Sequence, residues 1–142
     1  VLAAPVTTQI VGSASIERVS EFEDIASESP LRTVLSLDFR GEEFMGPRRL
    51  LDDESLWPDR VIVMTLARVG SGEGPDLDRL GSIIARAGKR KVYAAGGVRN
   101  RADLMALRDI GAAGVLVASA LHEGAITARD IKDAAAPLGP SR

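Results

Sequence analysis

Short apolar runs alternate along this chain with segments whose apolar residues recur at helical spacing. Several of the runs are apolar at successive positions, as strands buried on both faces are. The predicted strands are Val6–Val11, Thr33–Phe39, Val61–Leu66, Lys91–Ala95 and Gly114–Ala118. The predicted helices between them are Ser15–Ala26, Asp76–Ala87 and Arg101–Ile110. Strands and helices alternating in this order predict a parallel sheet with right-handed crossovers.

Polar and glycine residues mark where these elements begin and end. Ser15 and Asn100 stand where helix N-caps are expected, and Gly88 and Gly111 follow helices where a left-handed residue is favoured. The segment Gly41–Pro58 is the weakest unit, because prolines and acidic residues interrupt it, and we expect at most a helix of about two turns there.

Two architectures satisfy an alternating strand and helix order. One is an open doubly wound sheet, which binds ligands where its strand order reverses. The other is part of a barrel, whose ligands bind at the carboxyl ends of the strands. Periodicity alone leaves both open.

Composition limits the chemistry. The 142 residues suffice for one domain, residues 1–142, with a core of Val, Ile, Leu and Ala because aromatics are only 4%. The chain has no cysteine, which excludes disulfides, thiolate metal sites and a cysteine nucleophile. No metal-ligand cluster or nucleophile triad is apparent, so we predict neither a metal nor another cofactor.

Charge and hydropathy bear on partners. The 18 basic and 20 acidic residues are well mixed, so no basic stripe suggests a nucleic-acid partner. No apolar run approaches the ~20 residues that cross a bilayer, so no membrane association is predicted. A cytoplasmic protein is the expectation.

Three predicted strands end in small residues immediately before a helix. These turns are Val11–Ser15, Ala94–Asn100 and Val117–Leu121. Glycine lets a backbone approach a ligand closely, and a following helix offers free N–H groups that favour an anion. In barrels, the loops after the last two strands commonly form one phosphate site. The alternative for each is a compact turn without a ligand, but three together favour anion binding.

Other polar residues have weaker signals. Asp38 closes a strand and is a candidate general acid or base, or else a structural aspartate. Thr65 ends the next strand and would orient a substrate hydroxyl, or is an ordinary strand residue. The glycine-rich loop Arg68–Pro75 would close over a ligand or is a plain connection. His122 is expected at the surface, and Asp52–Glu54 as a solvated charge run.

The stretch Val92–Ile126 resembles strands seven and eight of the histidine-biosynthesis barrels, the HisA isomerase and the HisF cyclase. Its Gly-Gly-Val turn and its Ala-Leu-x-x-Gly ending carry the resemblance. Leu35–Asp38 looks like their strand five, Met64-Thr65 like strand six and Val6–Ser13 like strand four. The similarity runs in order from Val6 to Ile131.

The resemblance implies a (β/α)8 TIM-type barrel, present here as about five β/α units, strands four to eight. It also implies a substrate with a phosphate at each end. One phosphate would be held by Gly96, Gly97, Ala118 and Ser119. The other would be held with the help of Gly12 and Ser13. Asp38 and Thr65 match members of the family's catalytic set.

The chain departs from the family pattern at two places. Val69 stands about where family enzymes carry an aspartate in the loop after strand six, and Ala118-Ser119 replaces the usual Gly-Arg. The strand-one aspartate is not in this sequence. In these respects the chain looks like the divergent HisA-related branch, for which a role in one-carbon pterin cofactor synthesis has been suggested.

Two functions are therefore expected. The first is a phosphoribosyl-binding barrel related to the phosphoribosylformimino-aminoimidazole carboxamide ribotide isomerase, performing an aldose–ketose (Amadori) isomerisation. The alternative is a non-catalytic phosphometabolite-binding protein or a tetrahydromethanopterin cofactor biosynthesis protein. In either case the partner is a phosphorylated small molecule. A full barrel needs about 250 residues, so we expect the missing strands to come from further residues of the protein or from a second copy.

Overall fold

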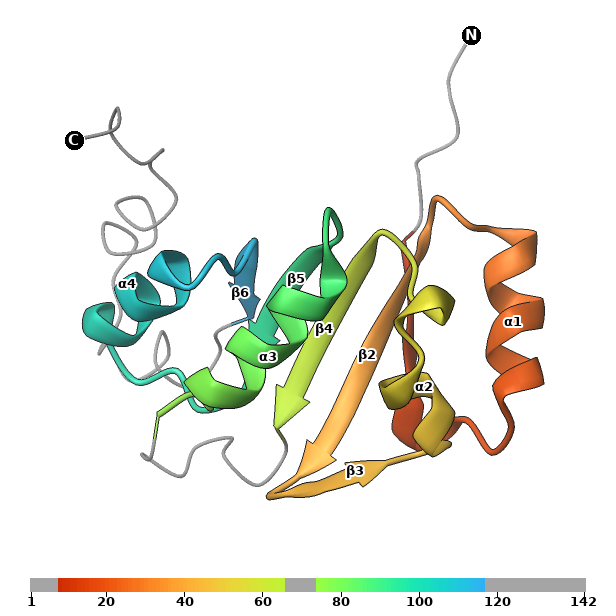
Figure 1. Ribbon diagram of the computed structural model, residues 1–142, viewed down its shortest axis with the longest axis horizontal. Helices are drawn as coiled ribbons and strands as arrows, with labels where there is room; N and C mark the ends of the chain where they lie inside the picture. Colours follow the sequence, from red (N-terminus) through yellow and green to blue (C-terminus); the bar gives the residue numbers. More distant parts are fainter. Residues whose placement is uncertain (1–7, 66–73, 117–142) are drawn as a thin grey trace, which may run out of the picture.

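The computed structural model describes residues 8–65 and 74–116. The strands are β1 (Gln9–Gly12), β2 (Thr33–Arg40), β3 (Glu43–Met45), β4 (Arg60–Thr65), β5 (Lys91–Ala95) and β6 (Gly114–Leu116). The α-helices are α1 (Val19–Glu28), α2 (Arg48–Asp52), α3 (Leu77–Ala87) and α4 (Arg101–Asp109), and the 3-10 turns are η1 (Ser13–Ser15) and η2 (Glu54–Leu56). Figure 1 shows the strands side by side with their connecting helices.

The parallel strands lie in the sheet in the order β1-β2-β4-β5-β6, which is their order along the chain. A doubly wound sheet would reverse its order at a switch point, and this order has no reversal. The result is the sheet of a partial TIM-type barrel, as predicted. The open doubly wound alternative is wrong.

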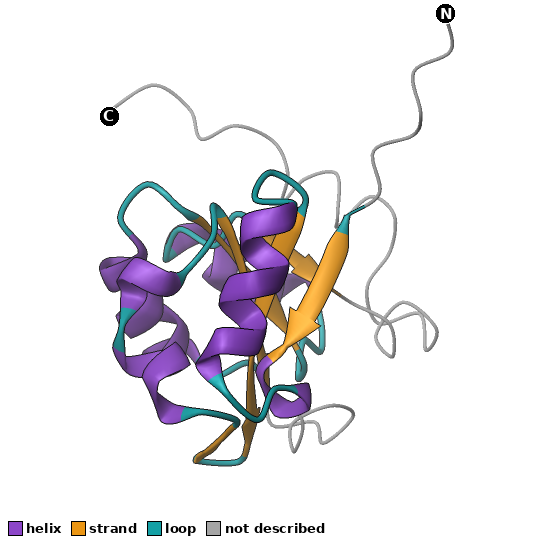
Figure 2. Cartoon of the chain, turned by 90° about the vertical axis from the view of Figure 1, so that its right-hand side faces the viewer, coloured by secondary structure: helices purple, strands orange, loops and turns teal. Residues whose placement is uncertain are grey.

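Helices cover one face of this sheet. The main core joins strand residues that share that face to residues of all four α-helices, among them Phe22, Leu50, Ile83 and Leu107. Figure 2 shows the helices gathered on one side and strands exposed to the other. In a barrel this is the outer face, and the opposite face lines the interior.

The interior-facing side has a smaller core of its own. Val34, Ile62 and Ala95 form it, with Met64 and Tyr93 packed against it. Because successive strand residues point to opposite faces, residues two positions apart share a face.

The first helix begins later than predicted. Its N-cap is Arg18, not Ser15, and α1 starts at Val19. The Ser15 hydroxyl instead donates to the Gly12 carbonyl at 2.7 Å within the turn η1. Arg18 N–H donates to Glu21 Oε1 at 3.1 Å, so the helix is capped three residues downstream of the predicted N-cap.

The other boundaries agree with the sequence. The Asn100 side chain accepts from Asp103 N–H at 3.1 Å and caps α4, as predicted. Gly88 and Gly111 have positive φ values, 63° and 97°, which favour glycine at these positions after a helix. Helix α3 is preceded by Asp76, which accepts from Arg79 N–H at 3.0 Å.

The segment between β2 and β4 holds the expected short helix, α2, and a strand that the sequence did not predict. Strand β3 pairs antiparallel with the end of β2, with Asp38 opposite Met45 and Phe39 opposite Phe44. The rings of Phe39 and Phe44 meet edge to face with centroids 5.3 Å apart. Three residues give too short a pattern to identify a strand without its partner.

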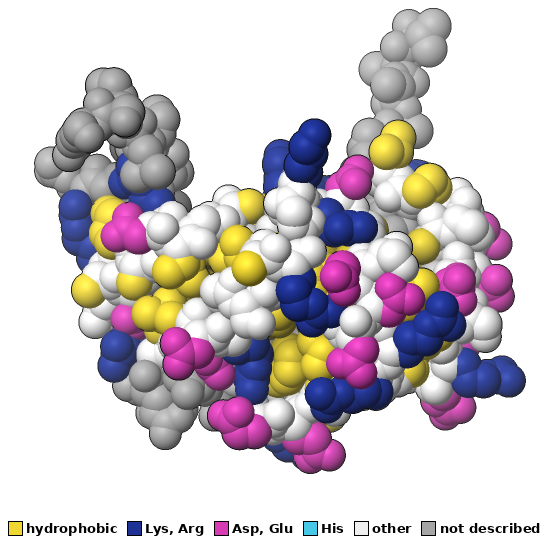
Figure 3. Space-filling view, viewed as in Figure 1, with side chains coloured by type: hydrophobic (Ala, Val, Ile, Leu, Met, Phe, Trp, Pro, Cys, Tyr) yellow, Lys and Arg dark blue, Asp and Glu magenta, His cyan; other side chains and the backbone are white. Residues whose placement is uncertain are grey.

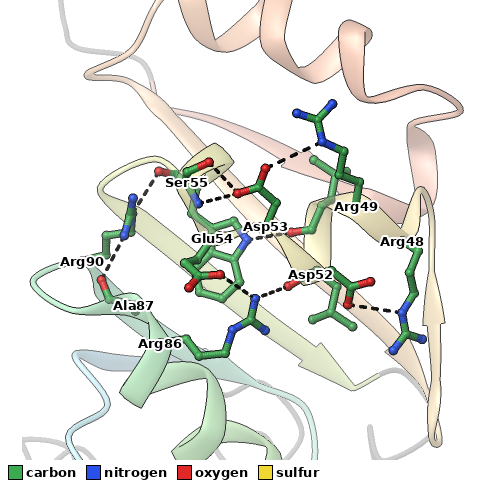
Figure 4. A network of polar contacts seen from close by, with 12 residues as sticks. Arg48, Arg49, Asp52, Asp53, Glu54, Ser55, Arg86, Ala87 and Arg90 are labelled. Carbon is green, nitrogen blue, oxygen red and sulfur yellow. Dashed lines mark hydrogen bonds and ion pairs between the residues drawn. The ribbon is translucent and has the colours of Figure 1, made fainter.

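The acidic run after α2 is ion-paired as well as solvent-accessible, which corrects the expectation of a merely solvated run. Its carboxylates meet three arginines, as Figure 4 shows: Arg48–Asp52 at 3.4 Å, Arg49–Asp53 at 3.7 Å and Arg86–Glu54 at 3.1 Å. The Glu54 pKa is lowered by a hydrogen bond from its own backbone N–H and then by Arg86. The last pair joins this segment to α3.

Across residues 8–65 and 74–116, none of the helices has the length and apolar character needed to cross a membrane.

Candidate active site

Asp38 lies at the carboxyl end of β2 on the interior-facing side of the sheet, and only 9% of it is exposed. Both of its carboxylate oxygens accept hydrogen bonds: Oδ1 from the Ser36 hydroxyl at 2.7 Å and Oδ2 from Ala14 N–H at 3.1 Å. The contacts fix the direction in which the carboxylate points.

Gly12 makes room for this carboxylate. A Cβ at Gly12 would lie 2.8 Å from Asp38 Oδ2, which is closer than real Cβ contacts come. The sequence suggested Gly12 as a phosphate-binding residue. The structure shows a steric role beside Asp38.

Ser13 is fully buried, and its hydroxyl is occupied by protein groups. It donates to the Met45 carbonyl at 2.7 Å and accepts from Asp38 N–H at 2.9 Å. A Cβ at Gly46, whose φ is 122°, would collide with the Ser13 carbonyl oxygen. Ser13 therefore ties the end of β1 to β2 and to the β3 hairpin, and in this arrangement its hydroxyl does not face a ligand.

Thr65 does not join Asp38. In the β2–β4 register Asp38 pairs with Met64, whereas Thr65 pairs with Phe39, so Thr65 and Asp38 point to opposite faces of the sheet. The Thr65 hydroxyl accepts from Arg79 Nη1 at 3.3 Å on the helix side. In this register the two candidate residues therefore do not face the same side of the sheet.

Arg79 is a residue whose importance the sequence did not indicate. Its guanidinium lies over the Phe39 ring, 4.0 Å from the centroid, and donates to the Gly41 carbonyl at 2.8 Å. It also lies 3.5 Å from the Asp76 carboxylate, and its side chain is only 11% exposed. Arg79 thus fastens the turn after β2 to the start of α3. A single arginine in a polar helix face gives no sequence signal for such a role.

The turn after β5 has the backbone that a close approach requires. Gly96 and Gly97 have φ values of 95° and 83°, which side chains with a Cβ rarely adopt. Asp38, Met64 and Ala95 pair in one row across β2, β4 and β5. The turn therefore begins two strand spacings, about 10 Å, from the Asp38 backbone and at the same end of the sheet.

The start of α4, just after this turn, carries an oriented arginine. Asp103 accepts from Arg99 N–H at 2.8 Å and from its Nε and Nη2 at 2.9 and 3.0 Å. These bonds lower the Asp103 pKa below its ordinary value of 3.8. A Cβ at Gly74 would lie 2.9 Å from Arg99 Cζ, so the guanidinium packs closely on the segment before α3.

The remaining predicted features lie wholly or largely outside the described residues. They are Ala118, Ser119, Val69, His122 and the loop Arg68–Pro75, of which only its last two residues are described. Within residues 8–65 and 74–116, no group of three or more His, Asp or Glu side chains is placed to hold a metal ion.

Comparison with known proteins decides the family. A family model described as histidine biosynthesis protein matches residues 1–127. The chain belongs to this family. The sequence resemblance to histidine-biosynthesis barrels is thereby confirmed.

Curated relatives are 1-(5-phosphoribosyl)-5-((5-phosphoribosylamino)methylideneamino)imidazole-4-carboxamide isomerases. The chain is 29% identical to that of Salinispora tropica, over 82% of this chain and 54% of the relative. It is 30% identical to those of Myxococcus xanthus and a Synechococcus species, over 84% and 94% of this chain and 54% and 56% of the relatives. The chain therefore spans about half the length of the curated relatives that it matches.

One solved structure supports the fold alone. A chain of the Amycolatopsis orientalis BexX/CysO complex superposes with a TM-score of 0.53 at 19% identity, covering 95% of this chain and 72% of that chain.

Proposed function

We propose that this family member is an isomerase-type barrel acting on a phosphorylated ribosyl substrate, with Asp38 as the group that takes up and returns a proton. The observation that carries the proposal is the orientation of the Asp38 carboxylate by Ser36 and Ala14 at the carboxyl end of β2. Barrel enzymes perform their chemistry at this end of the strands.

We further propose that Gly96 and Gly97 hold a phosphate of the substrate. Their left-handed backbone and the adjoining N-terminus of α4 suit an anion. Ala118 and Ser119 follow β6 in the sequence, separated from it by one residue, and β6 pairs with β5. We therefore propose that these two residues complete the phosphate site.

The amino-terminal turn is assigned differently in this proposal. Gly12 and Ser13 are proposed to act on the reaction by shaping the surroundings of Asp38. Any contribution to a second phosphate site would come from their backbone N–H groups. Thr65 acts through Arg79, by anchoring α3 beside the carboxyl end of β4. These are positioning roles.

The named activity of the relatives gives the proposal a specific reaction. An aldose–ketose (Amadori) isomerisation needs an acid and a base at the substrate, and Asp38 supplies one of them. Val69 occupies the sequence position where the family carries a second acid. The second group is therefore expected from a part of the barrel that lies outside residues 8–65 and 74–116.

Barrel completion belongs to the same proposal. Among the described residues, β1 and β6 each pair with a single parallel neighbour, so a closed barrel requires more strands. We propose that further residues of the protein or a second copy of the chain supply them.

The second candidate function is a phosphometabolite-binding protein without turnover, or a protein of tetrahydromethanopterin cofactor biosynthesis. Two observations favour it: Val69 in place of the loop acid, and the position of Thr65 on the face opposite to Asp38. It predicts ligand binding with no isomerised product.

The substitution Asp38→Asn separates these functions. It keeps the shape of the side chain and removes its ability to take up a proton, so we expect turnover of the relatives' phosphoribosyl substrate to fall by about 100-fold or more. Substrate affinity, measured by calorimetry, should change little. Product formation is followed by chromatography of the reaction mixture.

The matched control is Asp24→Asn, which removes the same charge from an exposed position on α1. It should leave turnover unchanged. Equal turnover in Asp38→Asn and the unsubstituted protein would remove Asp38 from the mechanism. Binding without turnover in the unsubstituted protein would favour the second function.

A further inference from the structure

A cavity lies at the end of the sheet opposite to Asp38. It has a volume of about 550 Å³, and its lining residues come from the segments that lead into β2, β4 and β5: Leu31, Trp57, Asp59, Arg60, Lys89, Arg90 and Lys91. Arg60 and Lys91 pair in register as the first residues of β4 and β5. Met64, the partner of Asp38, lies four residues further along β4, about 13 Å away. The cavity is therefore separate from the candidate active site.

The cavity is strongly cationic. Four of its side chains are basic and one, Asp59, is acidic. Figure 3 shows dark blue Lys and Arg atoms gathered at the upper edge of the molecule, over the start of β5 in the orientation of Figure 1. Such a concentration of one sign raises the local concentration of oppositely charged ligands.

The two arginines of the cavity are held by neutral groups. Arg60 Nη2 donates to the Leu31 carbonyl at 3.3 Å. Arg90 Nε donates to the Trp57 carbonyl at 3.0 Å and its Nη1 to the Ala87 carbonyl at 3.2 Å, the latter visible in Figure 4. Backbone carbonyls orient a guanidinium but do not cancel its charge.

The two lysines are exposed, and neither forms an ion pair with any residue in the described ranges. The backbone beneath them is fixed, because Lys91 N–H donates to the Asp59 carbonyl at 2.8 Å. Nearby arginines behave differently: Arg48, Arg49 and Arg86 each face a carboxylate. None of the four basic side chains of the cavity forms an ion pair with another residue in the described ranges.

From these features we infer a second ligand site, for a small molecule that carries at least two phosphate groups. The volume lies within the range of small-molecule sites, about 300–1,000 Å³, and exceeds what one phosphate fills. The four basic side chains that line the cavity, Arg60, Lys89, Arg90 and Lys91, carry enough positive charge to balance two phosphate groups. The site is distinct from the proposed isomerase site and does not depend on that function.

Binding of inorganic pyrophosphate tests this inference. Titration of ¹⁵N-labelled protein at low ionic strength should shift the backbone amides of Arg60 and residues 89–91. The double variant Lys89→Gln/Lys91→Gln removes two of the four basic side chains and should bind pyrophosphate at least tenfold more weakly, a change that corresponds to about 1.4 kcal/mol. Thermal unfolding verifies that each variant is folded.

The control Arg18→Gln/Arg48→Gln removes two exposed charges outside the cavity, one at the N-cap of α1 and one on α2, and should bind as the unsubstituted protein does. Shifts confined to Gly96 and Gly97, equal weakening in both double variants, or no binding would each overturn the inference. Loss of isomerase activity in Asp38→Asn bears on the other site only, so the two proposals fail separately.

Discussion

The Asp38 carboxylate, a candidate identified from the sequence, is oriented in part by a residue that is distant in the chain. Its place at the end of a strand was predictable, because the apolar run Thr33–Phe39 fixes the strand. The Ala14 N–H donor was not, because Ala14 lies 24 residues away and only the parallel pairing of β1 with β2 brings it near. The same pairing buries Ser13 and brings its hydroxyl to the Asp38 N–H.

The close contact at Gly12 gives a prediction at the residue scale. Gly12→Ala would place a methyl group 2.8 Å from Asp38 Oδ2, so either the carboxylate or the end of β1 must move. We expect a loss of about 1–3 kcal/mol in the free energy of unfolding, measured by urea denaturation.

Gly81→Ala is the matched control, because a Cβ there meets nothing within 4 Å and the position lies inside α3. Alanine should stabilise that helix by up to about 1 kcal/mol. An equally tolerated Gly12→Ala would show that the carboxylate is not confined at Gly12.

At the scale of elements, the sequence predicted the first and last residues of α3 and α4 to within one residue. Helix α3 begins at Leu77 against a predicted Asp76, and α4 ends at Asp109 against a predicted Ile110. Helix α1 was misplaced at its start because Ser15 forms a local bond to Gly12, which competes with helix capping. Strand β3 was missed because its stability comes from β2 and from Ser13.

The start of α4 gives a prediction about pH. Arg99 lowers the Asp103 pKa below 3.8, so the folded state binds that proton less readily than the unfolded state does. The resulting stabilisation is present above the unfolded value and is lost as the pH falls through the folded pKa. Because the Arg99 side chain is 46% exposed, we expect about 1 kcal/mol or less.

Asp103→Asn tests this by urea unfolding near neutral pH and near pH 3 or below. The variant should be less stable at neutral pH, and the difference from the unsubstituted protein should narrow in acid. Asp109→Asn, an exposed substitution at the other end of α4, should show no such narrowing. A difference that stays constant with pH would exclude the ion pair as its origin.

At the scale of the whole molecule, the architecture followed from the alternating pattern and the family resemblance, and the sheet order confirmed it. Periodicity alone left a doubly wound sheet open, since both folds bury parallel strands under helices. Two facts decide between them: the strand order has no reversal, and the main core joins each α-helix of the described residues to one face of the sheet. Both depend on contacts between distant segments.

The two terminal parallel strands of the described sheet give a prediction about assembly. Ile10 on β1 and Leu116 on β6 are 59% and 50% exposed, and exposed strand edges recruit other strands. We expect residues 1–142, prepared alone, to self-associate in light scattering, and Ile10→Lys/Leu116→Lys to shift the population toward monomer.

Leu77→Lys places the same charge on an exposed residue of α3, away from both edges, and should leave the assembly unchanged. A chain that is monomeric without substitution would contradict association through β1 and β6.

The Ser13 hydroxyl joins three segments that are distant from one another in the chain. It touches the backbone of two segments, 25 and 32 residues further along the chain, and none of the three segments reaches its final position by itself. A chain in which the β3 hairpin is frayed would therefore lose the contact of this hydroxyl with Met45, while Ser36 and Ala14 would still orient the Asp38 carboxylate.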